Sequence, residues 1–156
     1  MRHMQILTAV LFITNSLPAE EKPQEIPADL LKIFEHAESV EFFSMNAQPV
    51  KADEMPEFHG WQVLGKTHIE KKERQVIVQE LTLALEKNGL VSRCFFPRHG
   101  LRFTQGDRQV DLVICFQCNW VKIYANDQEE EQNLFIAAGP RGRFNEILRR
   151  ANVTLP

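Results

Sequence analysis

Four short runs rich in β-branched and aromatic residues follow one another between Leu90 and Ala125. They read LVSRCFF, LRFT, QVDLVICFQC and WVKIYA. The segment QGDR at 105–108, between the second run and the third, has the composition of a tight hairpin connection. Consecutive strands joined by such short connections pair antiparallel with their neighbours. The pattern therefore predicts an antiparallel β-meander and disfavours a doubly wound parallel sheet.

Helical spacing of apolar residues occurs in three other places. We predict one helix after Pro27, a second over 71–87 with Asn88-Gly89 as its left-handed stop, and a third after Pro140. Further strands are predicted at 39–44 and 61–69, with a loop over 46–60 between them. The apolar positions expected on the buried sides of the helices are Leu30, Leu31, Phe34 and Ala37, then Ile77, Val78, Leu81, Ala84 and Leu85, then Phe144, Ile147, Leu148 and Ala151.

These elements predict an α+β fold. At 156 residues the chain is long enough for one domain with a proper core and short for two. We expect an antiparallel β-meander sheet packed against two or three helices, in a single domain over residues 28–156.

The N-terminus has the order of a secretory signal peptide. Arg2 lies near the start, the apolar run ILTAVLFI covers residues 6–13, and Ala19 is a small residue at the expected cleavage point. This run is far shorter than the roughly 20 apolar residues that a membrane-spanning helix needs. We predict a signal peptide over 1–19, a flexible leader over 20–27 (EEKPQEIP) and export to the periplasm or the exterior, with no membrane span after cleavage.

The charge balance gives no support for nucleic-acid binding. The chain has 18 Lys and Arg residues against 21 Asp and Glu residues, a formal net charge of −3. Proteins that bind nucleic acid usually present a clustered basic surface. The expected partner is therefore an unknown protein or small ligand in the exported compartment.

Cysteines at 94, 115 and 118 suggest one disulfide and one odd thiol. If Thr104 faces Gln109 across the predicted turn, the residue numbers of each facing pair add up to 213, and Cys94 would face position 119. A bulge near Pro97 shifts this register by about one residue and brings Cys94 opposite Cys118. If the whole of 97–100 loops out, Cys94 faces Cys115 instead. Either bond would close a loop of more than 20 residues and contribute about 3 kcal/mol in an oxidising compartment. We favour Cys94–Cys118 and leave Cys94–Cys115 open.

Two other chemistries use the same residues. Cys94, His99, Cys115 and Cys118 form a Cys3His set that zinc accepts, which makes zinc the alternative to no cofactor. The pair Cys115 and Cys118 also has the C-x-x-C spacing of thiol oxidoreductases, although no helical pattern follows it. On an extended strand this spacing would place the two side chains on opposite faces, roughly 10 Å apart along the chain.

A candidate binding loop lies between these cysteines. Arg98, His99 and Arg102 could surround an anion, with Gly100 allowing close approach of the backbone. The structural alternative pairs such arginines with acids like Asp111. No base and nucleophile can be paired from the sequence, so no catalytic residue is predicted. His59 and the two tryptophans, Trp61 and Trp120, are expected to have ordinary surface or packing roles.

The two segments that hold these residues carry a resemblance. CFFPRHG at 94–100 and VDLVICFQC at 110–118 resemble the C-x-x-P-R-H-G and V-D-L-x-I-C-F-x-C segments of a family of uncharacterised bacterial exported proteins. GWQVLGKT at 60–67 and FNEILRRANV at 144–153 are similar as well. The resemblance covers roughly residues 60–155 and implies membership with no established activity. We expect a non-catalytic binding or accessory module, braced by a disulfide, whose sheet face or hairpin meets its partner; the alternative is a zinc-binding or thiol-redox protein.

Overall fold

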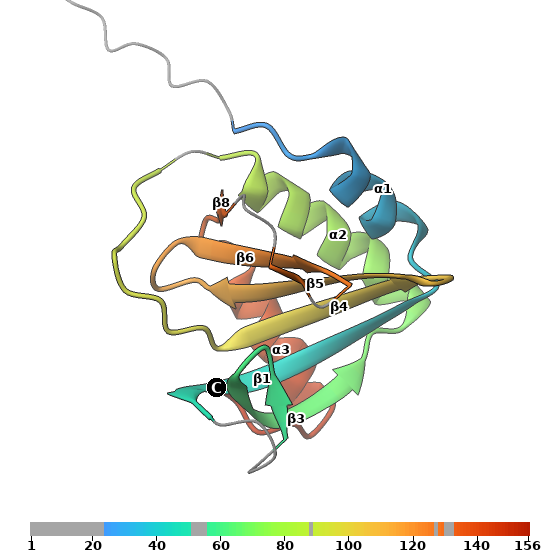
Figure 1. The fold of residues 1–156 in the computed structure, drawn as a ribbon. Helices are drawn as coiled ribbons and strands as arrows, with labels where there is room; N and C mark the ends of the chain where they lie inside the picture. Colours follow the sequence, from blue (N-terminus) through green and yellow to red (C-terminus); the bar gives the residue numbers. More distant parts are fainter. Residues whose placement is uncertain (1–23, 51–55, 88, 127, 130–132) are drawn as a thin grey trace, which may run out of the picture.

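One antiparallel sheet organises the fold, and helices cover one of its faces (Figure 1). The computed structural model describes residues 24–50, 56–87, 89–126, 128–129 and 133–156. Within these residues the sheet has eight strands in the order β2-β3-β1-β4-β5-β6-β7, and β8 also pairs with β6. The strands are β1 Ser39–Pro49, β2 Glu57–Phe58, β3 Trp61–His68, β4 His99–Gln105, β5 Arg108–Cys115, β6 Trp120–Ala125, β7 Gln128–Glu129 and β8 Leu134–Phe135. The helices are α1 Ala28–His36, α2 Lys71–Leu85 and α3 Arg141–Arg150.

The main core lies between the sheet and the helices. Alternate residues of the central strands point to this side, because side chains of a strand alternate between its two faces. Phe34 of α1 lies 4.6 Å from Phe103 of β4 between ring centroids, and Phe144 of α3 lies 5.0 Å from Phe42 of β1. All four rings are buried. The predicted α+β architecture, with the meander β4-β5-β6 against helices, is confirmed.

The tip of the β4–β5 hairpin has the predicted register. Thr104 faces Gln109, and Gln105 faces Arg108 around the turn at Gly106, whose φ is +54°. Glycine adopts this left-handed conformation without steric cost, which explains its place in the turn.

Several predicted boundaries need correction. The first strand runs to Pro49 and not to Ser44, and the predicted loop 46–60 contains β2. Ala151, expected in the buried stripe of the last helix, is exposed.

The run at 90–96 forms no strand. Its segment, residues 90–98, lies along the end of the sheet and is named the strap (Figure 1). Pro97 lacks an N–H group and cannot take part in a continuous ladder.

The predicted flexible leader is ordered where it is described. The side-chain amide of Gln24 donates to the carbonyls of Leu85 and Phe135 and accepts from the N–H of Phe135, and Ile26 belongs to the core. The prediction of a mobile leader is therefore wrong for residues 24–27. The predicted signal peptide and residues 20–23 lie outside the described residues. None of the helices in the described part of the chain has the length and apolar character that a bilayer crossing requires.

Gly100 is required for close packing on the face opposite the helices. A Cβ atom built there would lie 2.7 Å from the Phe58 ring, which is buried. We expect Gly100→Ala to lower the free energy of unfolding by about 1–3 kcal/mol, because the ring must shift. Gly142→Ala in α3 is the control: nothing lies within 4 Å of its Cβ, and loss of a helical glycine stabilises by about 0.5–1 kcal/mol. Urea unfolding of both variants measures the difference; equal effects would contradict the packing role of Gly100.

Candidate functional site

The face of the sheet turned away from the helices carries a second, smaller core. We name it the open face. Its buried residues are Phe43, Met45, Phe58 and Val113, and partly buried aromatic side chains pack against them. The β2–β3 hairpin lies across this face, and Phe95 of the strap packs against the second core. The open face is therefore partly covered, and the functional side chains gather where the hairpin meets the sheet.

The hairpin turn positions a histidine over the sheet. Phe58 pairs with Trp61, so His59 and Gly60 form a two-residue turn, with φ of +51° and +78°. Positive φ at both positions is the requirement of a type I′ turn. The His59 ring stacks on Tyr124 of β6, with centroids 3.7 Å apart. The turn thus reaches across the open face, from β2 and β3 at one edge of the sheet to β6 near the other edge.

A buried carboxylate holds this turn in place. Asp111 of β5 is fully buried. Its Oδ1 accepts from Nε of Arg102 at 2.9 Å, and its Oδ2 accepts from Nη2 of Arg102 at 2.7 Å and lies 2.7 Å from Nε2 of His59. Burial raises the pKa of Asp111, but the hydrogen bonds and charges of His59 and Arg102 outweigh it and hold this pKa below its usual value. The carboxylate is therefore ionised and joins β5, β4 and the hairpin.

A groove of about 820 Å³ lies beside this network. Phe43 and Phe58 stack at 4.2 Å between centroids and form an apolar wall. Lys66 Nζ lies 5.7 Å from the Phe43 ring centroid, and the guanidinium carbon of Arg102 lies 5.3 Å from that of Phe58. The groove thus combines aromatic rings with two cations, each paired with a carboxylate, and its lining also includes Glu57. Aromatic rings beside exposed polar groups are typical of a binding groove.

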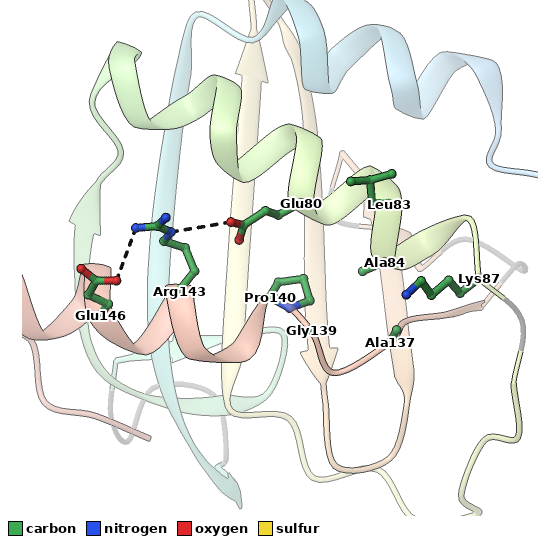
Figure 2. Close-up of a pocket in the computed structure, with 9 residues that line it drawn as sticks. All are labelled: Glu80, Leu83, Ala84, Lys87, Ala137, Gly139, Pro140, Arg143 and Glu146. Carbon is green, nitrogen blue, oxygen red and sulfur yellow. Dashed lines mark hydrogen bonds and ion pairs between the residues drawn. The ribbon is translucent and has the colours of Figure 1, made fainter.

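A second crevice, between α2 and α3, has a different character (Figure 2). Its volume is about 450 Å³. Arg143 lies between Glu80 and Glu146, at 3.7 Å and 3.3 Å, so these charges neutralise one another within the crevice. The groove of the open face has in addition a wall of stacked, buried aromatic rings, so we place the candidate site there and not between the helices.

The residues predicted as a binding loop do not form one surface. His99, Gly100 and Arg102 lie within β4, and only Arg98 precedes it. His99 points into the helix-side core, whereas Arg102 points to the opposite face and pairs with Asp111. The idea of a recognition loop is therefore wrong in its geometry. The structural alternative, an arginine paired with Asp111, is confirmed for Arg102.

His99 is enclosed by aromatic rings. It is 2 % exposed and contacts Phe42, Phe116 and Phe144, and its Nε2 lies 2.8 Å from Oδ1 of Asn145. Burial lowers the pKa of His99 from 6.5 to about 4, with smaller lowering effects from Arg141 and Arg98 against the raising effect of Asn145. The imidazole is therefore neutral at physiological pH and serves as a packed polar residue.

The disulfide joins Cys115 to Cys118, with Cα atoms 5.2 Å apart, and Cys94 is free and exposed. The predicted pairings Cys94–Cys118 and Cys94–Cys115 are therefore wrong. Residues 115–118 form the turn between β5 and β6, and not an extended strand, so their side chains meet. The register argument failed because β4 begins only at His99.

The four proposed zinc ligands are not brought together. Two of the sulfurs are bonded to each other, and His99 points to the helix side. Among the described residues, which include all four ligands, no group of three or more His, Cys, Asp or Glu side chains could hold a metal ion. The predicted Cys3His site does not form in this structure.

Sequence reasoning missed His59, Phe58 and Lys66 as site residues. Two signals were available. A His-Gly pair between two aromatic residues, Phe58 and Trp61, fits a type I′ turn. A carboxylate at position 111, inside an otherwise apolar strand, indicates a buried charge that needs partners.

Removing the charge of Asp111 tests the network. We expect Asp111→Asn to lower the free energy of unfolding by about 3 kcal/mol at neutral pH, because it removes the buried charge that Arg102 pairs with. Since the pKa of Asp111 is lower in the folded state, its contribution is present above about pH 4 and is lost as the pH falls further. The difference from wild type should therefore shrink in acid. Asp107→Asn, at the exposed hairpin tip, is the control; an equal cost there would contradict the prediction.

His99 gives a separate pH dependence. Its pKa is about 4 in the folded protein against 6.5 as the ordinary value, so the unfolded chain binds more protons in this window. Stability is therefore full above pH 6.5 and falls by about 3 kcal/mol as the pH drops towards 4. We expect His99→Phe to flatten this decline. Chemical denaturation at a series of pH values measures it, and an unchanged decline in the variant would refute the assignment.

Comparison with protein-family models, with curated proteins and with solved structures gives no match for this chain. The proposed function therefore rests on the geometry of this chain alone.

Proposed function

We propose that this protein is a small, non-catalytic binding module that acts after export and takes an extended segment of a partner protein on its open face. The single observation that carries the proposal is the groove of about 820 Å³ along β3, where an aromatic wall and two cations face the same space. The Cys115–Cys118 disulfide is compatible with an oxidising compartment.

The edge of the sheet supports an extended ligand. The N–H of Ile69 donates to the carbonyl of Val40 at 2.8 Å. Because hydrogen-bonding positions alternate along an antiparallel strand, Lys66 directs its backbone groups away from β1. Among the described strands, β2 pairs only with the first two residues of β3. A peptide strand added here would satisfy these groups, and its alternate side chains would enter the groove.

The charges favour an acidic segment. Lys66 binds Glu41 at 2.7 Å, but the lysine side chain is 56 % exposed. Lys66 is the exposed member of this pair, and it lines the groove, so its ammonium group is accessible to a ligand. Arg102 is held beside Phe58 by its two hydrogen bonds to Asp111, which balance most of its charge, so Lys66 is the cation expected to meet the ligand. We therefore expect peptides with an apolar residue close to a carboxylate.

The accessibility of His59 supports binding over catalysis. The His59 and Asp111 side chains are 9 % and 1 % exposed. One face of the imidazole is covered by Tyr124. A general base needs contact with a substrate proton at hydrogen-bond distance. The buried pair is better suited to hold the hairpin than to act on a substrate.

A displayed library of random peptides, panned against the oxidised protein, tests the proposal. We expect enriched peptides that pair an apolar residue with an acidic one. Lys66→Glu should weaken their binding about tenfold, equivalent to 1.4 kcal/mol, because it reverses a charge that lines the groove. Lys32→Glu on α1 makes the same charge change on an exposed residue of the helix layer. Fluorescence polarisation with a labelled peptide measures both variants.

Two results would contradict the proposal. One is a library that yields no enriched peptide under conditions where a known peptide-binding domain succeeds. The other is equal weakening by both variants, which would indicate a general effect of charge and not a site in the groove.

A further inference from the structure

Exposed large apolar side chains concentrate in the strap. Within the described residues they are Val76, Leu83, Leu90, Val91, Phe96 and Leu155. Three of these six lie between residues 90 and 96, and Leu90 is 92 % exposed. Single exposed apolar residues are normal on a protein surface, whereas a group of them marks a surface that meets an apolar partner. The strap is therefore a candidate interaction surface, separate from the groove of the open face.

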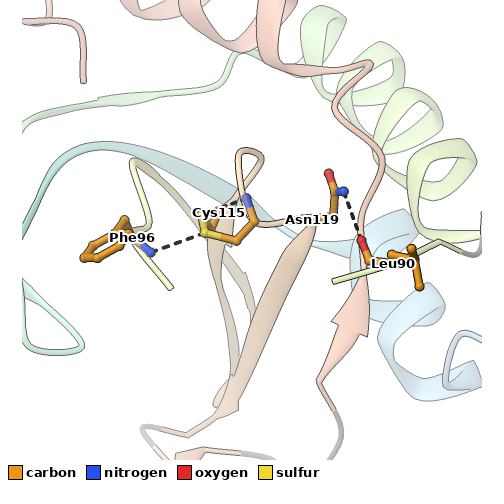
Figure 3. The surroundings of a disulfide bond; sticks show 5 residues. Leu90, Phe96, Cys115 and Asn119 are labelled. Carbon is orange, nitrogen blue, oxygen red and sulfur yellow. Dashed lines mark hydrogen bonds between the residues drawn. A yellow bond between two sulfur atoms is a disulfide. The ribbon is translucent and has the colours of Figure 1, made fainter. Parts of the chain in front are cut away.

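The β5–β6 turn holds the strap in its exposed position. The side-chain amide of Asn119 donates to the carbonyl of Leu90 at 3.2 Å (Figure 3). The N–H of Ser92 donates to the Cys118 carbonyl at 3.0 Å, and the N–H of Phe96 donates to the Cys118 Sγ at 3.5 Å. In Figure 3 the side chains of Leu90 and Phe96 point away from the turn. Because the backbone is fixed, these side chains are already placed for a partner, which lowers the entropy cost of binding.

The strap is also cationic, although the chain as a whole is acidic. The sequence from Lys87 to Gly106 contains no Asp or Glu, whereas the formal net charge of the chain is −3. Arg93 and Arg98 lie in the strap and are exposed. Within the part of the chain that the structure describes, neither arginine pairs with a carboxylate, unlike Arg102 of the groove. Apolar side chains and available positive charges therefore occur together on one segment.

This combination indicates the kind of partner. Figure 1 shows the strap as the outer rim at one end of the sheet. An outer rim needs no shaped complement when its partner is a fluid lipid interface, and anionic phosphates attract the arginines. A second copy of this chain fits less well, because a symmetric contact would bring the same cations towards one another.

We propose that the strap binds the surface of an anionic lipid membrane. Leu90, Val91 and Phe96 enter the interface between headgroups and acyl chains, and Arg93 and Arg98 contact the lipid phosphates. The contact is peripheral, since the apolar group is far too short to span a bilayer. It does not depend on the proposed peptide partner, because none of the residues that line the groove belongs to the strap.

A dye attached to Cys94 reports this contact locally. Cys94 is the free, exposed thiol of the strap, so a polarity-sensitive maleimide dye labels the full oxidised chain there without any substitution. We expect its emission to shift to shorter wavelength with vesicles of phosphatidylcholine mixed with phosphatidylglycerol, and not with phosphatidylcholine alone. The shift should decrease at high salt, because salt screens the attraction of the arginines. The control carries the same dye at the tip of the β4–β5 hairpin, in Asp107→Cys with Cys94→Ser, and should show no shift.

Matched variants separate the apolar and the electrostatic contributions. In vesicle co-sedimentation, Val91→Ser should weaken binding about threefold or more. Val76→Ser on α2 should have no effect, although this valine has almost the same exposure (42 % against 45 %). Arg93→Gln should weaken binding about fivefold, and Arg108→Gln at the exposed hairpin tip should not. All variants share the same N-terminal apolar run, so differences among them report on the strap.

Several results would overturn the proposal. They are a Cys94 dye that does not shift with anionic vesicles, an equal shift with neutral vesicles, and an equal shift of the dye at position 107. Equal weakening by the strap variants and their controls would overturn it as well. A dimer that Val91→Ser dissociates, in a protein whose Cys94 dye does not respond to vesicles, would assign the surface to a second copy instead.

Discussion

The buried carboxylate of Asp111 determines how the open face is built. Removing a carboxylate from water is costly unless hydrogen bonds and opposite charge replace the lost hydration. Arg102 and His59 supply both, and they come from β4 and from the β2–β3 turn. The network thereby holds the hairpin down on the sheet. The network also positions Phe58, because this residue comes directly before His59 in the hairpin and its ring stacks on Phe43. Both the second core and the wall of the groove depend on this one residue.

The alternation of β4 separates residues that are adjacent in the sequence. His99 faces the aromatic core under α3, and Arg102, three positions later, faces Asp111 on the opposite side. Gly100 lies beneath the Phe58 ring. A contiguous motif therefore contributes to two separate environments, neutral and apolar on one side and charged on the other. The face on which a side chain lies, and not its distance along the chain, decides which chemistry it takes part in.

The sequence predicted what local rules determine. The third helix depends on the spacing of its apolar residues, and the Thr104–Gln109 register depends on one turn. Both features are found in the structure. The cysteine pairing failed because the register was extended past Pro97, where the chain leaves the sheet and follows the β5–β6 turn. The groove could not be predicted either. It arises where residues from β1, β2, β3 and β4 meet, and no local pattern specifies that the His59-Gly60 turn folds over the open face.

The two cysteine pairings share Cys118 and differ in what they constrain. Cys115–Cys118 closes a very short loop, since the residues are three positions apart. In the chain-entropy description such a bond stabilises by about 2 kcal/mol, against about 3.5 kcal/mol for a loop the length of Cys94–Cys118. Restriction of the unfolded chain therefore gives no advantage to the bond observed. Its advantage lies in the folded turn, where the N–H groups of Phe96 and Cys118 donate to the two sulfurs. The pairing is thus explained by local contacts of the folded β5–β6 turn and of Phe96, which a register argument carried along the sequence does not include.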